Sequence, residues 1–164
     1  MFFDKIESIR NIADVQSVGA LFQAYQIIPF FYLFSDQDSK NSTSVIAQCY
    51  QAGIELPERD YYFNADESTK EIREKYLIHL TKMFELLKDE HSVAEKNAET
   101  IMKMETQLAE ASFTNVENQD PVKTYNKVTI EGLNKLAPEI NWNSYFSQAG
   151  YPGLSEVNIW QPGF

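Results

Sequence analysis

The sequence predicts a mainly α-helical fold that also contains a short β-hairpin or strand. Residues 68–87 and 92–111 each begin with a polar helix-start signal and continue with apolar residues at helical spacing. In residues 43–56 the side chains instead follow a two-residue alternation and form no helical stripe, which is typical of a strand. With 43% hydrophobic residues, 11 Phe, 9 Tyr and 2 Trp, the 164-residue chain has enough apolar side chain for an ordered core.

The first forty residues predict two helices and a turn. Residues 2–11 form a short helix in this interpretation. Asp14 is the predicted cap of a second helix, residues 15–27, which Pro29 ends. The polar residues 35–42 predict a turn. The expected apolar face of the second helix consists of Val18, Leu21, Phe22 and Tyr25.

Two capping boxes predict the long central helices. Ser68 with Glu71 opens the first, and Ser92 with Glu95 opens the second. Residues 88–91 form the short turn between them, so we expect an antiparallel helical pair. The expected inward positions of the first helix are Ile72, Tyr76, Leu77, Leu80, Phe84 and Leu87. Those of the second helix are Ala94, Ala98, Ile101, Met102, Glu105 and Leu108.

The last third of the chain predicts three short helices and a strand. Asp120 followed by Pro121 is typical of a helix start. Thr129 is the expected cap of a second short helix, with Ile130, Leu133 and Leu136 inward. Residues 141–149 form the third, which Gly150 ends. Residues 157–160 resemble a strand without a visible partner. This pattern fits a truncated part of a larger domain, and it fits an ordinary frayed terminus equally well.

The charge of the chain excludes some classes of partner. The formal net charge is −10 and the pI is about 4.6. Such a field repels nucleic acid and anionic membrane surfaces. No segment reaches the roughly 18 consecutive apolar residues of a membrane span. We therefore expect no nucleic-acid partner and no membrane span in this chain.

The residue types that catalysis requires are present but do not form a recognisable pattern. His79 and His91 are twelve residues apart, and neither starts the HExxH pattern of a helical zinc site. Cys49 is the only cysteine and is expected to be a small core residue. The acidic residues 36–42 lack the glycine and glutamate of a calcium loop. We expect no catalytic residue and no metal ligand set in the chain.

Three motifs resemble segments of the neprilysin-like (M13) zinc metallopeptidase family. Residues 53–62 read Gly-Ile-Glu-Leu-Pro-Glu-Arg-Asp-Tyr-Tyr, close to the family's Gly-Leu-x-Leu-Pro-x-Arg-Asp-Tyr-Tyr. Residues 38–42 match its Asp-x-Lys-Asn-Ser turn, and residues 120–129 match its Asp-Pro-x-x-x-Tyr-Asn-x-x-Thr segment. The chain departs from the family pattern at Ile54 and Glu55, and at Gln119, where an arginine often stands.

The resemblance implies a helical, non-catalytic lid. Residues 1–164 would be a single partial domain from the N-terminal part of a zinc metalloendopeptidase whose C-terminal catalytic domain, with its zinc, is absent. The intact domain would enclose the active-site cavity and restrict substrates to short peptides. Its partners would be its own catalytic domain and those peptides. The resemblance also favours an extracytoplasmic location, in the periplasm, at the cell surface or secreted.

The signature positions are expected to be architectural. Leu56-Pro57 would fix an extended backbone, Arg59 would pair with Asp60 or another carboxylate, and the rings of Tyr61 and Tyr62 would be buried. No residue is assigned to catalysis or to a metal, and the substrate-contacting residues stay unknown. The signature positions are Asp38, Asn41, Gly53, Leu56, Pro57, Arg59, Asp60, Tyr61, Tyr62, Asp120, Pro121, Tyr125 and Asn126.

Two alternatives stay open at the level of sequence. The chain could be a stand-alone acidic helical module that binds a protein partner. It could also be the shell of a family member that has lost catalysis and keeps a ligand-binding cavity. An HExxH motif in a continuation of the chain would discriminate against both.

Overall fold

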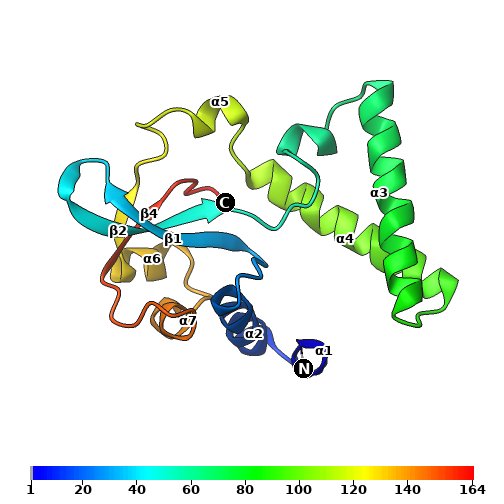
Figure 1. Ribbon diagram of the computed structural model, residues 1–164, viewed down its shortest axis with the longest axis horizontal. Coiled ribbons are helices and arrows are strands. Elements are labelled where there is room, and N and C mark those ends of the chain that lie inside the picture. Colours follow the sequence, from blue (N-terminus) through cyan, green and yellow to red (C-terminus); the bar gives the residue numbers. More distant parts are fainter. Residues whose placement is uncertain (1) are drawn as a thin grey trace. The chain divides into compact units, whose positions relative to one another are not determined.

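The computed structural model describes residues 2–164, which form two compact units. The first unit contains the described residues up to Gly53 together with Asp120–Pro162. The second contains Ile54–Gln119 together with Gly163–Phe164. Figure 1 shows the elements of both units, and the predicted mainly helical fold with a β-hairpin is confirmed.

The first unit is built on a four-stranded sheet. Its strands are β1 (Phe31–Asp38), β2 (Asn41–Gln51), β3 (Lys127–Thr129) and β4 (Glu156–Ile159), in the order β1-β2-β4-β3. β1 and β2 form the antiparallel hairpin, β4 pairs parallel to β2, and β3 pairs antiparallel to β4.

Two expectations about these strands were wrong. The segment 35–42 is mostly strand, and the turn is confined to the two residues between β1 and β2. The polar residues 35–37 and 41–43 are all exposed, so this end of the hairpin extends into water and needs no apolar side chains. The strand at 157–160 has two partners among the described residues, because Val157 lies opposite both Ala47 and Val128. The Ala47 pairing spans 110 positions, so no local pattern could indicate it.

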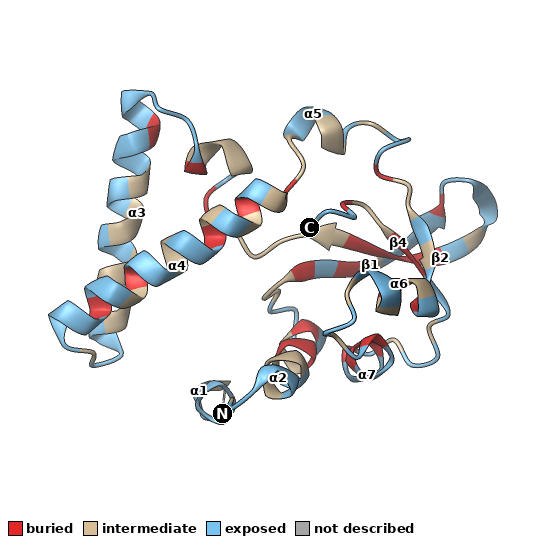
Figure 2. Ribbon diagram, turned by 180° about the vertical axis from the view of Figure 1, so that it is seen from behind, coloured by how far each residue is buried: buried red, intermediate tan, exposed pale blue. Residues whose placement is uncertain are grey.

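Helices cover one face of this sheet. α2 (Ile12–Ala24), α6 (Ile130–Leu136) and α7 (Trp142–Gln148) lie on the same side of it, and α1 (Phe2–Glu7) lies beside α2 (Figure 1). The rings of Trp142 and Tyr145 pack on Phe31, with centroids 5.6 and 5.2 Å away. Figure 2 shows the buried residues of this unit on the strands and on the helix faces turned toward them.

α2 begins earlier than predicted and buries a different face. Asn11, not Asp14, is its cap, and the Asn11 side chain accepts a hydrogen bond from the Asp14 backbone N–H. The buried residues of α2 are Gly19, Ala20 and Gln23, whereas Val18, Leu21, Phe22 and Tyr25 are half-buried or exposed. Small residues face inward because α2 packs closely: a Cβ on Gly19 would lie 2.6 Å from the Phe30 ring.

The second unit is a helical hairpin with two short helical turns. α3 (Glu67–Leu86) and α4 (His91–Ala111) pack against each other, which confirms the predicted pair. Ala94, Ala98 and Ala109 of α4 are buried and allow close approach. Leu87, expected inward, is 52% exposed, and Ile72 is exposed as well. The other two elements are η1 (Arg59–Tyr62) and α5 (Asn115–Asn118).

The predicted starts of the long helices need correction. Asp66 caps α3 and accepts from the Thr69 N–H, while the Ser68 hydroxyl donates to the Asp66 carboxylate. α4 begins at His91 after Glu90, and no side chain caps it. An aspartate two residues upstream therefore took the role assigned to Ser68, because a carboxylate at the N-terminus also interacts favourably with the helix dipole.

In the last third of the chain, one predicted helix is wrong and two are confirmed. Asp120 and Pro121 form a turn, in which the Asp120 carboxylate accepts from the backbone N–H groups of Val122 and Lys123. Thr129 caps α6 as predicted, although Leu136 is exposed rather than inward. Asn141 caps α7, and Gly150 follows it at φ +97°. The short helix α5, which a Thr114–Glu117 capping box starts, was not predicted.

Candidate functional site

The signature residues of the first unit converge on a buried carboxylate. Asp38, at the end of β1, is 2% exposed. It accepts hydrogen bonds from the Tyr125 hydroxyl (2.9 Å) and the Lys40 backbone N–H (2.9 Å). The N–H of Lys40, together with Tyr125 and Lys127, holds the pKa of Asp38 below its usual value despite burial. The hairpin turn is thereby joined to the segment that leads into β3.

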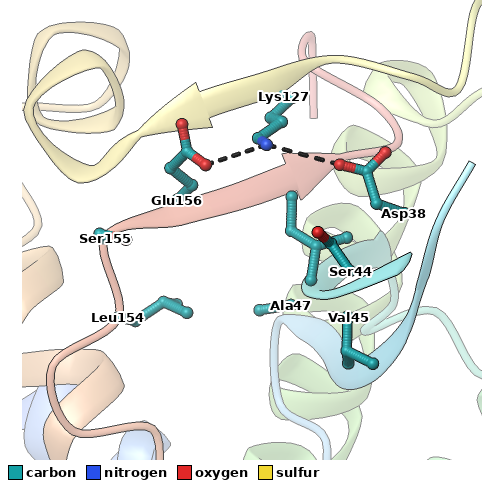
Figure 3. A pocket seen from close by; sticks show the side chains of 9 residues that line it. Asp38, Ser44, Val45, Ala47, Lys127, Leu154, Ser155 and Glu156 are labelled. Atoms are coloured by element: carbon teal, nitrogen blue, oxygen red, sulfur yellow. Dashed lines mark hydrogen bonds and ion pairs between the residues drawn. The ribbon is translucent and has the colours of Figure 1, made fainter. Parts of the chain in front are cut away.

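Lys127 links Asp38 to a second carboxylate. Its ammonium lies 3.4 Å from Asp38 and 2.9 Å from Glu156, and the hydrogen bond to Glu156 is the main cause that raises its pKa. Figure 3 shows Lys127 between the two acids. All three residues line a cavity of about 240 Å³. The other lining residues are Ser44, Val45, Ile46, Ala47, Leu154 and Ser155. Because the three charges pair with one another, they hold strands together rather than present a free reactive group.

Asn41 and Asn126 each organise a local turn. The Asn41 amide donates to the Ser44 hydroxyl and accepts from the Thr43 hydroxyl, both at 2.8 Å, at the start of β2. Asn126 donates to the Ile159 carbonyl, and its backbone N–H donates to Asn158. Both side chains therefore fix backbone geometry next to the sheet.

A buried amide network continues from Asn126 across the sheet. Asn158 donates to the Gln48 side-chain oxygen (2.8 Å), which also accepts from the Trp160 indole N–H (2.9 Å). Asn158 further donates to the Thr124 carbonyl. Gln48 and Asn158 were not predicted as site residues, although a polar residue inside an otherwise apolar strand is a usable signal.

The signature residues of the second unit surround another buried carboxyl group. Glu105 of α4 is 6% exposed and accepts from the hydroxyls of Tyr62 (2.6 Å) and Tyr76 (2.7 Å). The Tyr62 oxygen in turn accepts from the Leu56 backbone N–H (3.2 Å). Burial, reinforced by Glu105, raises the pKa of both tyrosines. The short helix η1 is thus tied to both α3 and α4.

Arg59 and the residues beside it complete this corner. The Arg59 side chain donates to the Ala109 carbonyl and pairs with Asp60, both at 3.1 Å, and its guanidinium lies over the Phe63 ring. Tyr61 is half-buried against the Leu56, Tyr62 and Ala109 cluster, and its carbonyl accepts from Arg73. Gly53 has φ +80°, and Pro57 and Pro121 are exposed.

The cysteine and the histidines lie apart from these networks. Cys49 is buried on β2, and burial raises the pKa of its thiol to about 12. His91 is exposed at the start of α4 between Glu85 and Glu95, at 2.6 and 3.3 Å, and His79 is exposed on α3. Across residues 2–164, no three His, Cys, Asp or Glu side chains are grouped as a metal site requires.

In the part of the chain that the structure describes, no helix is both long and apolar enough to cross a bilayer.

Similarity to known proteins agrees with this architecture. The profile of the family described as peptidase family M13, for its N-terminal region, matches residues 2–164. The chain belongs to this family. Members are zinc-dependent peptidases, whereas the described residues of this chain offer no ligand set that fits zinc.

Relatives and solved structures show how much of a family member the chain represents. Endothelin-converting enzyme 1 of Rattus norvegicus and that of Homo sapiens are each 36% identical over 140 residues, covering 84% of this chain and 18% of the relative. The inhibitor complex of zinc metalloprotease ZMP1 from Mycobacterium tuberculosis matches with a TM-score of 0.92 and 27% identity, covering 99% of this chain and 25% of that protein.

A more distant structure supports the fold alone. PEPO from Lactobacillus rhamnosis matches with a TM-score of 0.79 at 14% identity, covering 98% of this chain and 25% of that protein. The chain therefore spans about a fifth to a quarter of the length of the proteins it matches.

Proposed function

We propose that the chain is a non-catalytic part of the N-terminal domain of a zinc metalloendopeptidase, where it helps to enclose the active-site cavity. The observation that carries the proposal is the match to zinc metalloprotease ZMP1, which extends over 99% of this chain at a TM-score of 0.92. In this proposal, residues 1–164 are a partial domain. The remaining three quarters of the protein hold the zinc and the catalytic residues.

The buried networks support an architectural role for the signature residues. Each of three signature residues bonds to another segment of its own unit. Asp38 bonds to the Tyr125 hydroxyl, Arg59 to the Ala109 carbonyl and Tyr62 to the Glu105 carboxyl group. A wall that restricts access must hold its shape when substrate enters, and fully bonded buried polar groups give that rigidity. We infer that these residues shape the shell and do not contact the reacting peptide bond.

Enclosure would limit substrates to short peptides and keep bulk water from the reaction. The partners of the chain would then be its own catalytic domain and those peptides. The proposal also includes an extracytoplasmic location for the intact protein, which fractionation of the source cells tests.

The absence of catalysis in the chain alone is tested with quenched fluorescent peptides. The purified 164-residue chain is expected to give no turnover, with or without added zinc, because its described residues offer no zinc ligand set. Zinc-dependent turnover that co-purifies with the chain and is abolished by a chelator would contradict the proposal.

Enclosure is tested on the intact protein with a substrate series. One cleavable sequence is placed in peptides of increasing length and in a loop of a folded protein. The proposal predicts a steep fall in kcat/KM with size. Equal cleavage of the longest unfolded peptide, the folded host and the shortest peptide would contradict it.

A further inference from the structure

Strand β1 is an edge of the four-stranded sheet. The order β1-β2-β4-β3 leaves one side of β1 without a strand neighbour among the described residues. An edge strand carries backbone N–H and C=O groups that can pair with a strand of another molecule, so folded proteins cover or interrupt such edges.

The side chain of Gln23 occupies part of this edge. It projects from α2, is 4% exposed and is a rare polar residue on the buried face of that helix. In the amide orientation that satisfies both groups, it donates to the Phe31 carbonyl (2.9 Å) and accepts from the Leu33 N–H (3.2 Å). These two groups flank Tyr32 and point away from β2.

The bonds of Gln23 reproduce those of a neighbouring strand. In a parallel ladder, one residue donates to a carbonyl and accepts from an N–H two residues further along its neighbour. A side-chain carboxamide carries the same donor and acceptor as a peptide group, so one glutamine can replace one residue of a strand. The close packing of Gly19 on Phe30 holds α2 near the start of β1.

Other side chains engage the groups that follow along the same edge. The Tyr151 hydroxyl donates to the Leu33 carbonyl (3.4 Å), and the Gln37 N–H donates to the adjacent Asp36 carboxylate (2.7 Å). Since backbone direction alternates along a strand, Ser35 presents its groups to this edge as well. On both sides of Ser35, side chains therefore form hydrogen bonds with backbone groups at the free edge of β1, namely those of Leu33 and Gln37.

We propose that Gln23 caps the β1 edge and thereby prevents a second copy of this chain from adding a strand there. The cap explains why a polar side chain lies on the core face of α2. It goes beyond the proposed peptidase role, because it concerns association of the folded chain and not its place in the parent protein.

Hydrogen exchange on the unmodified chain is the first test. The Leu33 amide, bonded to Gln23, is expected to exchange at least ten times more slowly than the Ser35 amide, which lies on the same edge without this cap. Equal exchange at Leu33 and Ser35 would overturn the proposal without any mutation.

The second test is Gln23→Met, which keeps the side-chain volume and removes both hydrogen bonds. Sedimentation velocity over a range of concentrations is expected to show at least tenfold tighter self-association than the unmodified chain. Adding Ser35→Pro is expected to reverse this, because proline on the outward side of an edge strand blocks pairing and leaves the ladder to β2 intact.

Circular dichroism establishes that the variants keep their helices and strands. A folded Gln23→Met chain that associates no more tightly than the unmodified chain would overturn the proposal. So would tighter association that Ser35→Pro leaves unchanged. If Gln23→Met does not fold, the exchange comparison decides.

Discussion

At the scale of single residues, one buried acid stabilises each unit from within. Glu105 accepts from the hydroxyls of Tyr62 and Tyr76, and Asp38 accepts from the Tyr125 hydroxyl and the Lys40 backbone N–H. A buried carboxyl group is costly unless hydrogen bonds replace its water, so these partners are required for the fold. Removal of one partner should therefore have a measurable effect.

Tyr62→Phe tests the Glu105 network. The variant loses the hydroxyl that donates to Glu105 and accepts from the Leu56 N–H, and leaves both groups buried with one partner fewer. We expect the free energy of unfolding to fall by about 1–3 kcal/mol. Urea denaturation measures it, with Tyr32→Phe on an exposed part of β1 as the matched control. A loss no larger than that of the control would show that the network does not stabilise the fold.

Asp38→Asn tests the first unit through its pH dependence. The pKa of Asp38 is lowered in the folded protein, so its charge stabilises the fold above the unfolded value near 3.8 and this contribution is lost as the pH falls below it. We expect the wild type to melt above the variant at pH 7 and the difference to shrink below pH 3.8. A difference that stays constant or widens in acid would contradict this assignment.

At the scale of elements, the sequence at the start of α3 allows two N-terminal caps, Asp66 and Ser68. Residues 66–71 contain both the Ser68 capping box and Asp66 two residues earlier, and the structure uses Asp66. Asp66→Ala is therefore expected to lower the melting temperature more than Ser68→Ala. Thermal melts of the two variants compare them directly, and a larger effect of Ser68→Ala would restore the capping-box interpretation.

Local signals predicted most of the helices, but not the strands β1 and β3 or the pairing of the strands. Thr129, Asn141 and Gly150 act within one helical turn, and the helices they delimit were found. The pairing of β4 with β2, and the capture of Glu105 by Tyr62 and Tyr76, join residues 29 to 110 positions apart. No short-range pattern contains such contacts.

The candidate site shows the same division. The family motifs marked Asp38, Tyr125 and Tyr62 as positions of interest, but not what they touch. Lys127, Asn158 and Tyr76 complete the networks and lie outside those assignments. Glu105 differs from these residues, because the sequence alone could mark it. A charged residue within the apolar stripe of α4 is itself a sign of a buried network.

At the scale of the whole molecule, the chain carries both exposed apolar side chains and a large charge. Val45, Leu86, Val116 and Val122 are each more than 70% exposed, and the formal net charge is −10. We expect the purified chain to bind the dye ANS through this apolar surface. Added salt should increase self-association, because it screens the repulsion between the acidic chains. A monomer without ANS signal at high and low salt would contradict this expectation.

The central claim is that this chain is the non-catalytic part of a larger zinc peptidase. The most direct measurement is the mass of the native polypeptide in its source cells, by immunoblotting with an antibody raised against residues 1–164. The account predicts a band several-fold larger than 18.9 kDa, because the chain covers a fifth to a quarter of the proteins it matches. A single band at 18.9 kDa would contradict it and would identify the chain as a product that acts without a catalytic domain.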